Sequence, residues 1–360
     1  MTLNTLRGVL FLVLSVVISS SGFASQDDQN QDEEFNATEM IMHHVKDAHE
    51  FHIFEWNNEQ ISISLPIILY TDNGIVTFMS SAFNHDDSGT QVVEKDGQRF
   101  VKFHEKIYQL NPGADSLAFD AEDTVTNASL PLDFSITRNV FMMWVSVLLL
   151  LFIFISSARK YKKASGHVPS GIASFVEPLV VFIRDDVAIP MIGEKKYRKY
   201  MPFLLSVFFF IWLNNIFGLI PILNGANVSG NIAFTLSLAL FTFFITMFSG
   251  NKNYWKHIFW MPDVPVAMKI FLAPIEIIGM FVKPFSLTIR LFANITAGHI
   301  IILSLMSLIF TFKSIAIAPV SVGFSLFILI IEIVVVAIQA YIFTVLSALY
   351  IGMATAEDNH

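Results

Sequence analysis

Cysteine is absent from this chain of 360 residues, which excludes disulfides and metal sites built on thiolates. Charged residues are scarce at 14%, whereas 54% of the residues are hydrophobic and the mean hydropathy is +0.60. The sequence also lacks a glycine-rich phosphate-binding loop and any visible internal repeat. These absences argue against a nucleotide-hydrolysing enzyme and against transporters built from inverted repeats. The composition predicts a protein that crosses a membrane several times.

The few charges are unevenly distributed along the chain. Residues 26–133 hold 21 of the 30 Asp and Glu residues but only 5 of the 22 Lys and Arg residues, a net charge of −16. An acidic part followed by a basic, apolar part is not a pattern typical of nucleic-acid binding. We therefore expect two parts in different solvents, an acidic domain at 26–133 and a membrane domain at 134–360.

The first 25 residues have the organisation of a signal peptide. Arg7 precedes the apolar run Val9–Ser19, and the small residue Ala24 follows near the expected cleavage point. An uncleaved N-terminal anchor is the alternative. Either way, we expect residues 26–133 to be exported from the cytoplasm.

The acidic part is predicted to be a small α+β domain. It contains an alternating strand pattern, turn signals, a hairpin centred on Asp-Gly and a short helix before them. These are, in order, Thr38–His49 for the helix, Ile61–Leu65, the turn Asp72–Gly74, and the strands Gln91–Lys95 and Gln98–Phe103 around Asp96–Gly97.

Four histidines of this domain invite a metal interpretation: His43, His44, His49 and His52. No carboxylate or further histidine falls at a recognisable ligand spacing. Surface or half-buried histidines are the preferred interpretation, and no metal and no cofactor is assigned.

Five apolar stretches are long enough to cross a membrane. Basic clusters at 159–163 and 195–199 follow the first stretch and precede the second, which predicts that the first runs from outside to inside and that the C-terminus is cytoplasmic. The five stretches are 139–158, 203–223, 232–249, 264–312 and 315–350.

The other segments of the membrane part differ from simple spans. Gly171–Gly193 is interrupted by charges and prolines, so it is predicted to be an interfacial amphipathic helix broken near Pro190. The last two stretches are too long for one upright span. We expect both to be tilted, with kinks of the first at Pro274 and Pro284.

Ionisable residues recur every seven positions in the fourth stretch, at Lys269, Glu276, Lys283 and Arg290. Seven residues turn a helix by about 700°, so successive members drift only about 20° and form one polar stripe. Such a stripe is expected to face a water-filled path or a partner. Lys269 and Lys283 have a simpler alternative, since long basic side chains also extend to the membrane surface.

The last two stretches form a hairpin that turns near Ser314. Arg290 lies 24 residues before this turn and Gln339 lies 25 after it, so the two are predicted to be level. His299 and Glu332, at 15 before and 18 after, form a second level nearer the outside. A histidine and a carboxylate in apolar surroundings suit a proton path, and a purely structural ion pair is the alternative.

Arg290 itself is not a proton relay, because a guanidinium stays protonated at any ordinary pH. Its expected role is electrostatic: it would keep a nearby carboxylic acid ionised and block proton leakage. No carboxylate of this chain is level with it. We therefore expect its partner on another subunit.

Several motifs of this part carry a family resemblance: Arg290–Asn294, Ala297–Gly298, Gln339 with Tyr350, and Leu213–Pro221. In this order they closely resemble subunit a of the rotary proton-translocating ATP synthase, over about residues 140–356. The N-terminal domain is an extension that the common family pattern lacks. In other members the histidine and the glutamate of the outer level occupy exchanged positions.

The resemblance implies a function as the proton channel of a bacterial inner-membrane complex, without a catalytic site of its own. It implies that Arg290 is essential and faces a ring of c subunits, between two half-channels whose protons neutralise and leave the ring carboxylates. Subunit b and membrane lipid are further implied partners. The implied path residues are Asn294, His299, Glu332 and Gln339, with Glu276, Lys283, Ser286 and Tyr350 in the cytoplasmic half-channel.

Two other functions remain open at this point. A self-contained channel or secondary transporter would need an acceptor for Arg290 within the chain. A structural role, in which the spans only anchor the N-terminal domain, would leave the polar residues of the last two helices without a purpose.

Overall fold

The computed structural model describes residues 46–56, 59–120, 124–163, 171–220, 227–262, 264–312 and 314–356. The predicted signal peptide lies outside the described residues, as does most of the predicted helix Thr38–His49. The chain divides into two compact units. The first contains residues 1–143, 217–227 and 302–325, and the second contains 144–216, 228–301 and 326–360.

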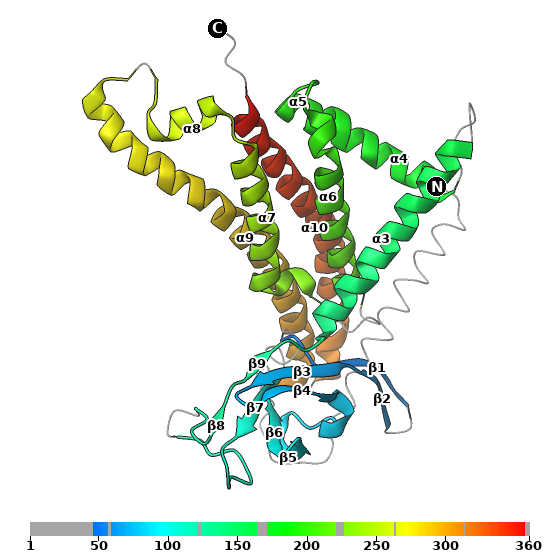
Figure 1. The fold of residues 1–360 in the computed structure, drawn as a ribbon. Coiled ribbons are helices and arrows are strands. Elements are labelled where there is room, and N and C mark those ends of the chain that lie inside the picture. The colour runs from blue at the N-terminus through cyan, green and yellow to red at the C-terminus, as the bar shows by residue number, and fades with distance from the viewer. Residues whose placement is uncertain are drawn as a thin grey trace, which may run out of the picture. The chain divides into compact units, whose positions relative to one another are not determined.

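The N-terminal domain, defined here as described residues 46–133, is built from antiparallel strands in three sheets (Figure 1). The sheets have the orders β1-β2, β4-β3-β9 and β5-β6-β7-β8. The strands are β1 Glu50–Trp56, β2 Glu59–Ser64, β3 Pro66–Thr71, β4 Gly74–Met79, β5 Ser88–Lys95, β6 Gln98–Phe103, β7 Lys106–Leu110, β8 Ala128–Ser129 and β9 Leu132–Asp133.

Both predicted turns of the domain are confirmed. β3 and β4 are joined at Asp72–Gly74, where Gly74 has a φ of 112° that favours glycine. Asp96 and Gly97 join β5 to β6 with φ of 51° and 72°, the two left-handed residues of a tight hairpin turn. The described end of the predicted helix is different, since residues 46–49 are not helical. Their backbone carbonyls bond to a distant segment instead of to a helical turn.

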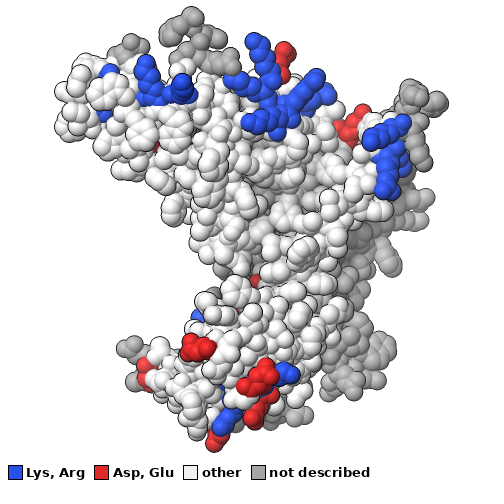
Figure 2. Space-filling model, viewed as in Figure 1, with Lys and Arg blue, Asp and Glu red and all other residues white. Residues whose placement is uncertain are grey.

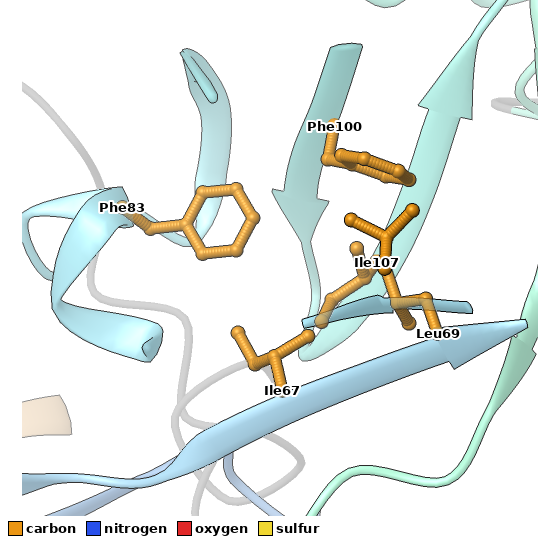
Figure 3. Packing of buried hydrophobic residues seen from close by; sticks show 6 residues of the cluster. Ile67, Leu69, Phe83, Phe100 and Ile107 are labelled. Atoms are coloured by element: carbon orange, nitrogen blue, oxygen red, sulfur yellow. The ribbon is translucent and has the colours of Figure 1, made fainter. Parts of the chain in front are cut away.

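An apolar core holds the domain together (Figure 3). Ile67 and Leu69 of β3 are completely buried, as are Phe83 of the 3-10 helix Ser80–Phe83 and Phe100 of β6. Ile67 and Leu69 lie two residues apart and therefore point to the same face of their strand. Val76 and Ile107 complete the buried cluster.

A buried ionic cluster lies beside this core. His49 Nε2 is 2.9 Å from a carboxylate oxygen of Asp133, and His49 Nδ1 is 3.7 Å from Glu105. Lys102 Nζ lies 3.8 Å from Glu105 and 3.9 Å from Asp87. His49 is therefore a member of a satisfied charge network, as the preferred interpretation of the histidines requires.

The segment at residues 46–51 fixes the start of the first membrane helix. Asp47 accepts hydrogen bonds from the Thr137 hydroxyl at 2.8 Å and from the Asn139 backbone N–H at 3.1 Å. The backbone N–H of Arg138 donates to the carbonyl of Ala48 at 2.8 Å. These bonds satisfy helix-terminal N–H groups that have no partner within a helix, so no free linker separates domain and helix.

Five helices are long and apolar enough to cross a membrane, which confirms the predicted spans. The last two are long: at 1.5 Å per residue, 46 residues measure about 69 Å, against a hydrocarbon core of about 30 Å. Pro274 and Pro284 lie inside the fourth helix without ending it. The spans are α3 Arg138–Lys163, α6 Tyr197–Leu219, α7 Ile232–Ser249, α9 Val266–Thr311 and α10 Ala318–Thr355, with the 3-10 turn Ile315–Ile317 before α10.

The predicted interfacial helix is present, but it does not break at Pro190. It consists of α4 Ile172–Phe182, a π-helical segment Ile183–Ala188 and α5 Ile189–Ile192. Proline has no N–H to donate, and here it stands in the first turn of α5, where none is needed. The irregularity precedes Pro190 as wide π-helical turns, so the helical path continues to Gly193.

Polar contacts join the helices of the second unit. The Ser146 hydroxyl donates to Asn214 across α3 and α6 at 2.9 Å, and the hydroxyls of Thr242 and Ser347 lie 3.2 Å apart across α7 and α10. A short helix, α8 Lys252–Phe259, follows α7. Figure 2 shows Lys and Arg gathered around the end of α3 and the start of α6, next to uncharged surface along the helices.

Candidate functional site

Helix α9 has a buried side and an exposed side around Arg290. Leu287, Leu291 and Ile295 are buried, with at most 2% of each residue exposed. Arg290 and Asn294, one helical turn apart, are exposed. The helix therefore packs on its own subunit with one face and presents its arginine on the other.

Arg290 forms no hydrogen bond or ion pair with any residue that the structure describes. Ala293 and Ala297 are exposed on the same face and were not singled out individually from the sequence. Small side chains at this spacing let another helix approach closely. The face around Arg290 is thus charged, accessible and flat.

Gln339 lies on α10 and is buried, with 7% exposed. No hydrogen bond joins it to Arg290 among the described residues. The two residues differ in exposure, and the predicted level pairing of Arg290 with Gln339 stays a prediction.

Glu332 has the most unusual environment of the site residues. It is 4% exposed, and neither carboxylate oxygen has a hydrogen-bond partner in the described part of the chain. Its carboxylate lies against Gly298 of α9 so closely that a Cβ at that position would collide with it. A buried acid without a partner is costly in a folded protein and marks a functional site.

Gly298 immediately precedes His299, which is half-buried. The contact between Gly298 and Glu332 therefore places this turn of α9 level with Glu332, as the hairpin count predicts. Gly298 appeared in the sequence only as part of a motif. Its close approach to the acid gives it a physical role, because any larger residue would displace the carboxylate.

A narrow cavity lies between α7, α8, α9 and α10, with about 270 Å³ of empty space. Lys283 lines it, with its Nζ 5.3 Å from the centre of the Tyr350 ring. Tyr350, Tyr254 and the threonines Thr242 and Thr246 line it too. The structure therefore brings Lys283 and Tyr350 together, as the cytoplasmic half-channel requires.

The other residues assigned to this half-channel lie differently. Glu276 is half-buried and acts electrostatically on both Lys283 and Tyr254. Ser286 is half-buried and does not line the cavity. Tyr254 was missed by the sequence analysis, because α8 was treated only as a basic loop. The Asn251 side chain, which caps α8 by accepting from the Tyr254 N–H at 2.8 Å, was the available signal.

Lys269 differs from the rest of the stripe. Its Nζ lies 5.0 Å from the centre of the Trp260 ring, just before α9 begins. A lysine and a tryptophan at the end of a span are typical of a membrane surface, which favours the simpler alternative for Lys269.

A comparison with protein families identifies the membrane part. The family model described as ATP synthase A chain matches residues 140–352. The chain belongs to this family. A second model, described only as a domain of unknown function, matches residues 40–134.

Relatives within the ATP synthase A chain family agree with this assignment. ATP synthase subunit a of Chloroherpeton thalassium is 49% identical over 234 residues, which are 63% of this chain and 69% of the relative. The protein of the same name from Chlorobium phaeobacteroides strain BS1 is 52% identical over 235 residues, 63% of this chain and 68% of the relative. That of an Anaeromyxobacter species is 40% identical over 245 residues, 65% of this chain and 59% of the relative.

As an ATP synthase A chain, the protein is the proton-channel subunit of a proton-transporting ATPase and not a catalytic subunit. The self-contained transporter is not favoured. The five spans, the buried Glu332 and the exposed Arg290 are the features through which this chain serves that role.

Proposed function

We propose that this chain couples proton flow to rotation by holding Arg290 against a ring of c subunits, each with a membrane carboxylate. The observation that carries the proposal is the exposed Arg290 without an ion pair among the described residues. A guanidinium in that position needs an acid, and Ala293 and Ala297 beside it leave room for a passing helix.

The outer half-channel passes His299 and Glu332. Glu332 is the better supported of the two, because its buried carboxylate lacks hydrogen bonds within the described residues. A proton taken up there moves to a ring carboxylate near Asn294 and Gln339. The neutral acid then leaves the polar face and turns into lipid.

The inner half-channel is the cavity lined by Lys283 and Tyr350, with Glu276 acting on Lys283. Ser286 belongs to the same path in this proposal. After nearly a full turn, a ring carboxylate approaches Arg290 from this side and loses its proton, because the positive charge favours the ionised form. Arg290 separates the two paths, since it cannot relay a proton itself.

The remaining elements of the proposal concern placement. The chain lies in a bacterial inner membrane, with residues 1–25 a signal peptide, residues 26–133 a periplasmic domain and residues 134–360 the channel. The C-terminus is cytoplasmic, because basic residues cluster at 159–163 and 195–199. Subunit b holds the channel against rotation. One charge crossing 100 mV yields about 2.3 kcal/mol, so several protons must combine for each ATP.

The test is ATP-driven proton pumping in membrane vesicles. Arg290→Ala is expected to abolish pumping while permitting a passive proton leak through the assembled complex. Ile289→Ala is the matched control, because Ile289 is also exposed on α9 but carries no charge. Co-purification of the ring separates a failure of coupling from a failure of assembly.

Normal pumping by Arg290→Ala vesicles would contradict the proposal. Proton flux through the purified chain, reconstituted without a ring, would instead support a self-contained channel. Unimpaired flux after replacing Arg290, Glu332 and Gln339 together would leave the structural role as the remaining function.

A further inference from the structure

The sheet β4-β3-β9 of the N-terminal domain is apolar on both faces. Ile67, Leu69 and Val76 fill its inner face, where at most 2% of each is exposed. An antiparallel sheet at a protein surface usually covers its core with one face and presents polar residues on the other. The second face of this sheet does not follow that rule.

The strand register defines the second face. Tyr70 of β3 lies directly opposite Ile75 of β4 and Leu132 of β9. Past the end of β9, the backbone N–H of Phe134 donates to the carbonyl of Ile68 at 2.8 Å, which continues the same register. Residues directly opposite each other share a face, so these side chains form one surface.

We call this surface the outer sheet face and define it by its five most exposed members. All are large, and between 45% and 68% of each is exposed. They are Tyr70 at 53%, Ile75 at 68%, Met79 at 45%, Leu132 at 62% and Phe134 at 65%.

The outer sheet face carries no charge. Along residues 66–70, 75–79 and 132–136, every outward position is apolar or aromatic except Thr77. The surrounding stretch 26–133 carries a net charge of −16, so an uncharged face of this size is a local exception. Contiguous apolar surface of this kind marks an interaction site.

The position of the face in the chain says what covers it. Phe134 precedes the membrane helix α3, which begins at Arg138, by four residues. The first turn of α3 is fixed to the domain by Asp47, which binds Thr137 and Asn139. β9 and β3 lie on the side of the domain from which α3 leaves (Figure 1). The outer sheet face is therefore continuous with the surface of the membrane that α3 enters.

From this continuity we infer that the outer sheet face rests on the membrane, with phospholipid of the adjoining leaflet as its occupant. Tyr70 and Phe134 are aromatic residues of the kind that favour the membrane interface. Ile75, Met79 and Leu132 enter the boundary between headgroups and acyl chains, as the apolar side of an interfacial element does. The domain is thus a membrane-bound platform at the start of α3. The inference is independent of the proton path proposed above.

The absence of cysteine makes a site-specific test straightforward. Ile75→Cys in the full chain is labelled with a small fluorophore and reconstituted into vesicles of phosphatidylcholine and phosphatidylglycerol. Some vesicles contain lipid with a nitroxide at the headgroup or high on the acyl chain, which quenches fluorophores in contact with lipid. Ile75 lies on β4, across β3 from the strand that leads into α3, so proximity to α3 alone does not explain a signal there. Asp96→Cys, in the exposed β5–β6 turn, is the matched control.

The expected result is that nitroxide lipid removes most of the fluorescence at position 75 and little at position 96, whereas aqueous iodide does the reverse. Leu132→Cys gives the same readout from β9 if the first variant fails to fold. Iodide quenching at position 75 equal to that of the control would overturn the inference, because the face would then be in water. Protection from both quenchers would overturn it as well, since a second copy, another subunit or another segment of this chain would then cover the face.

Discussion

The N-terminal domain and the membrane helices treat buried charge in opposite ways. In the domain, buried His49, Lys102 and Glu105 each have an opposite charge within 4 Å. In the helices, Glu332 is equally buried but has no hydrogen-bond partner among the described residues, and Arg290 has no ion pair there. Satisfied charges hold a fold together, whereas unsatisfied charges in apolar surroundings indicate work done with a moving partner.

The domain's cluster gives the first and largest expected effect, a dependence of its stability on pH. Burial alone would lower the pKa of His49, but hydrogen bonds with Asp133 and Glu105 outweigh burial and raise it to about 9. Burial alone would raise the pKa of Glu105, but the His49 hydrogen bond and the Lys102 charge lower it to about 2. A raised histidine pKa stabilises the fold below its unfolded value near 6.5 and loses that contribution as pH rises through 9.

We therefore expect the N-terminal domain to lose about 3 kcal/mol of unfolding free energy between pH 6.5 and pH 9. Hydrogen exchange of β3 and β6 amides in the full chain measures this loss. The contribution of Glu105 has the opposite sign and disappears only as pH falls from about 4.5 toward 2. His49→Gln is the control and should flatten the alkaline decline. A decline of the same size in that variant would assign it to other groups.

The second prediction concerns the unsatisfied acid. Glu332→Gln keeps the size of the side chain but removes proton exchange, so coupled proton flux is expected to fall about 100-fold, the usual scale for a positioned acid or base. Because the carboxylate has no hydrogen bond to lose among described residues, the helices should remain at least as stable. Flux and thermal unfolding of the same preparation separate the two effects. Unchanged flux at every pH would remove Glu332 from the path.

The smallest expected effect is that of Gly298→Ala. The added methyl group would collide with the Glu332 carboxylate, and such overpacking costs about 1–3 kcal/mol of stability. Proton flux should fall together with stability, because the acid is displaced. Gly298→Ala combined with Glu332→Asp is the control, since the shorter acid makes room. If the second change restores nothing, the contact does not position the acid.

Much of this comparison was predictable from the sequence where periodicity is strong. The spans follow from uncharged runs, and the turns at Asp72–Gly74 and Asp96–Gly97 follow from residues that adopt positive φ. The seven-residue spacing that ends at Arg290 needs only the geometry of a helix. Each of these signals is local in the chain.

The features that the sequence did not predict depend on contacts between distant segments. Tyr254 enters the cavity because α8 folds back beside α9 and α10. Residues 46–49 are not helical because their backbone groups bond to the start of α3. At Pro190, π-helical turns upstream replace the predicted break. The outer sheet face also needed the register between β3 and β9, which joins residues more than 60 positions apart.

The central claim is that Arg290 meets a carboxylate carried by another, moving subunit. Crosslinking tests it most directly, with Asn294→Cys as the only cysteine of this chain and a photoreactive group attached to it. The account predicts that the recovered crosslinked peptide comes from the ring subunit and contains its membrane carboxylate, and that the crosslink stops ATP-driven pumping. Crosslinks found only within this chain or to lipid, with pumping unchanged, would contradict it.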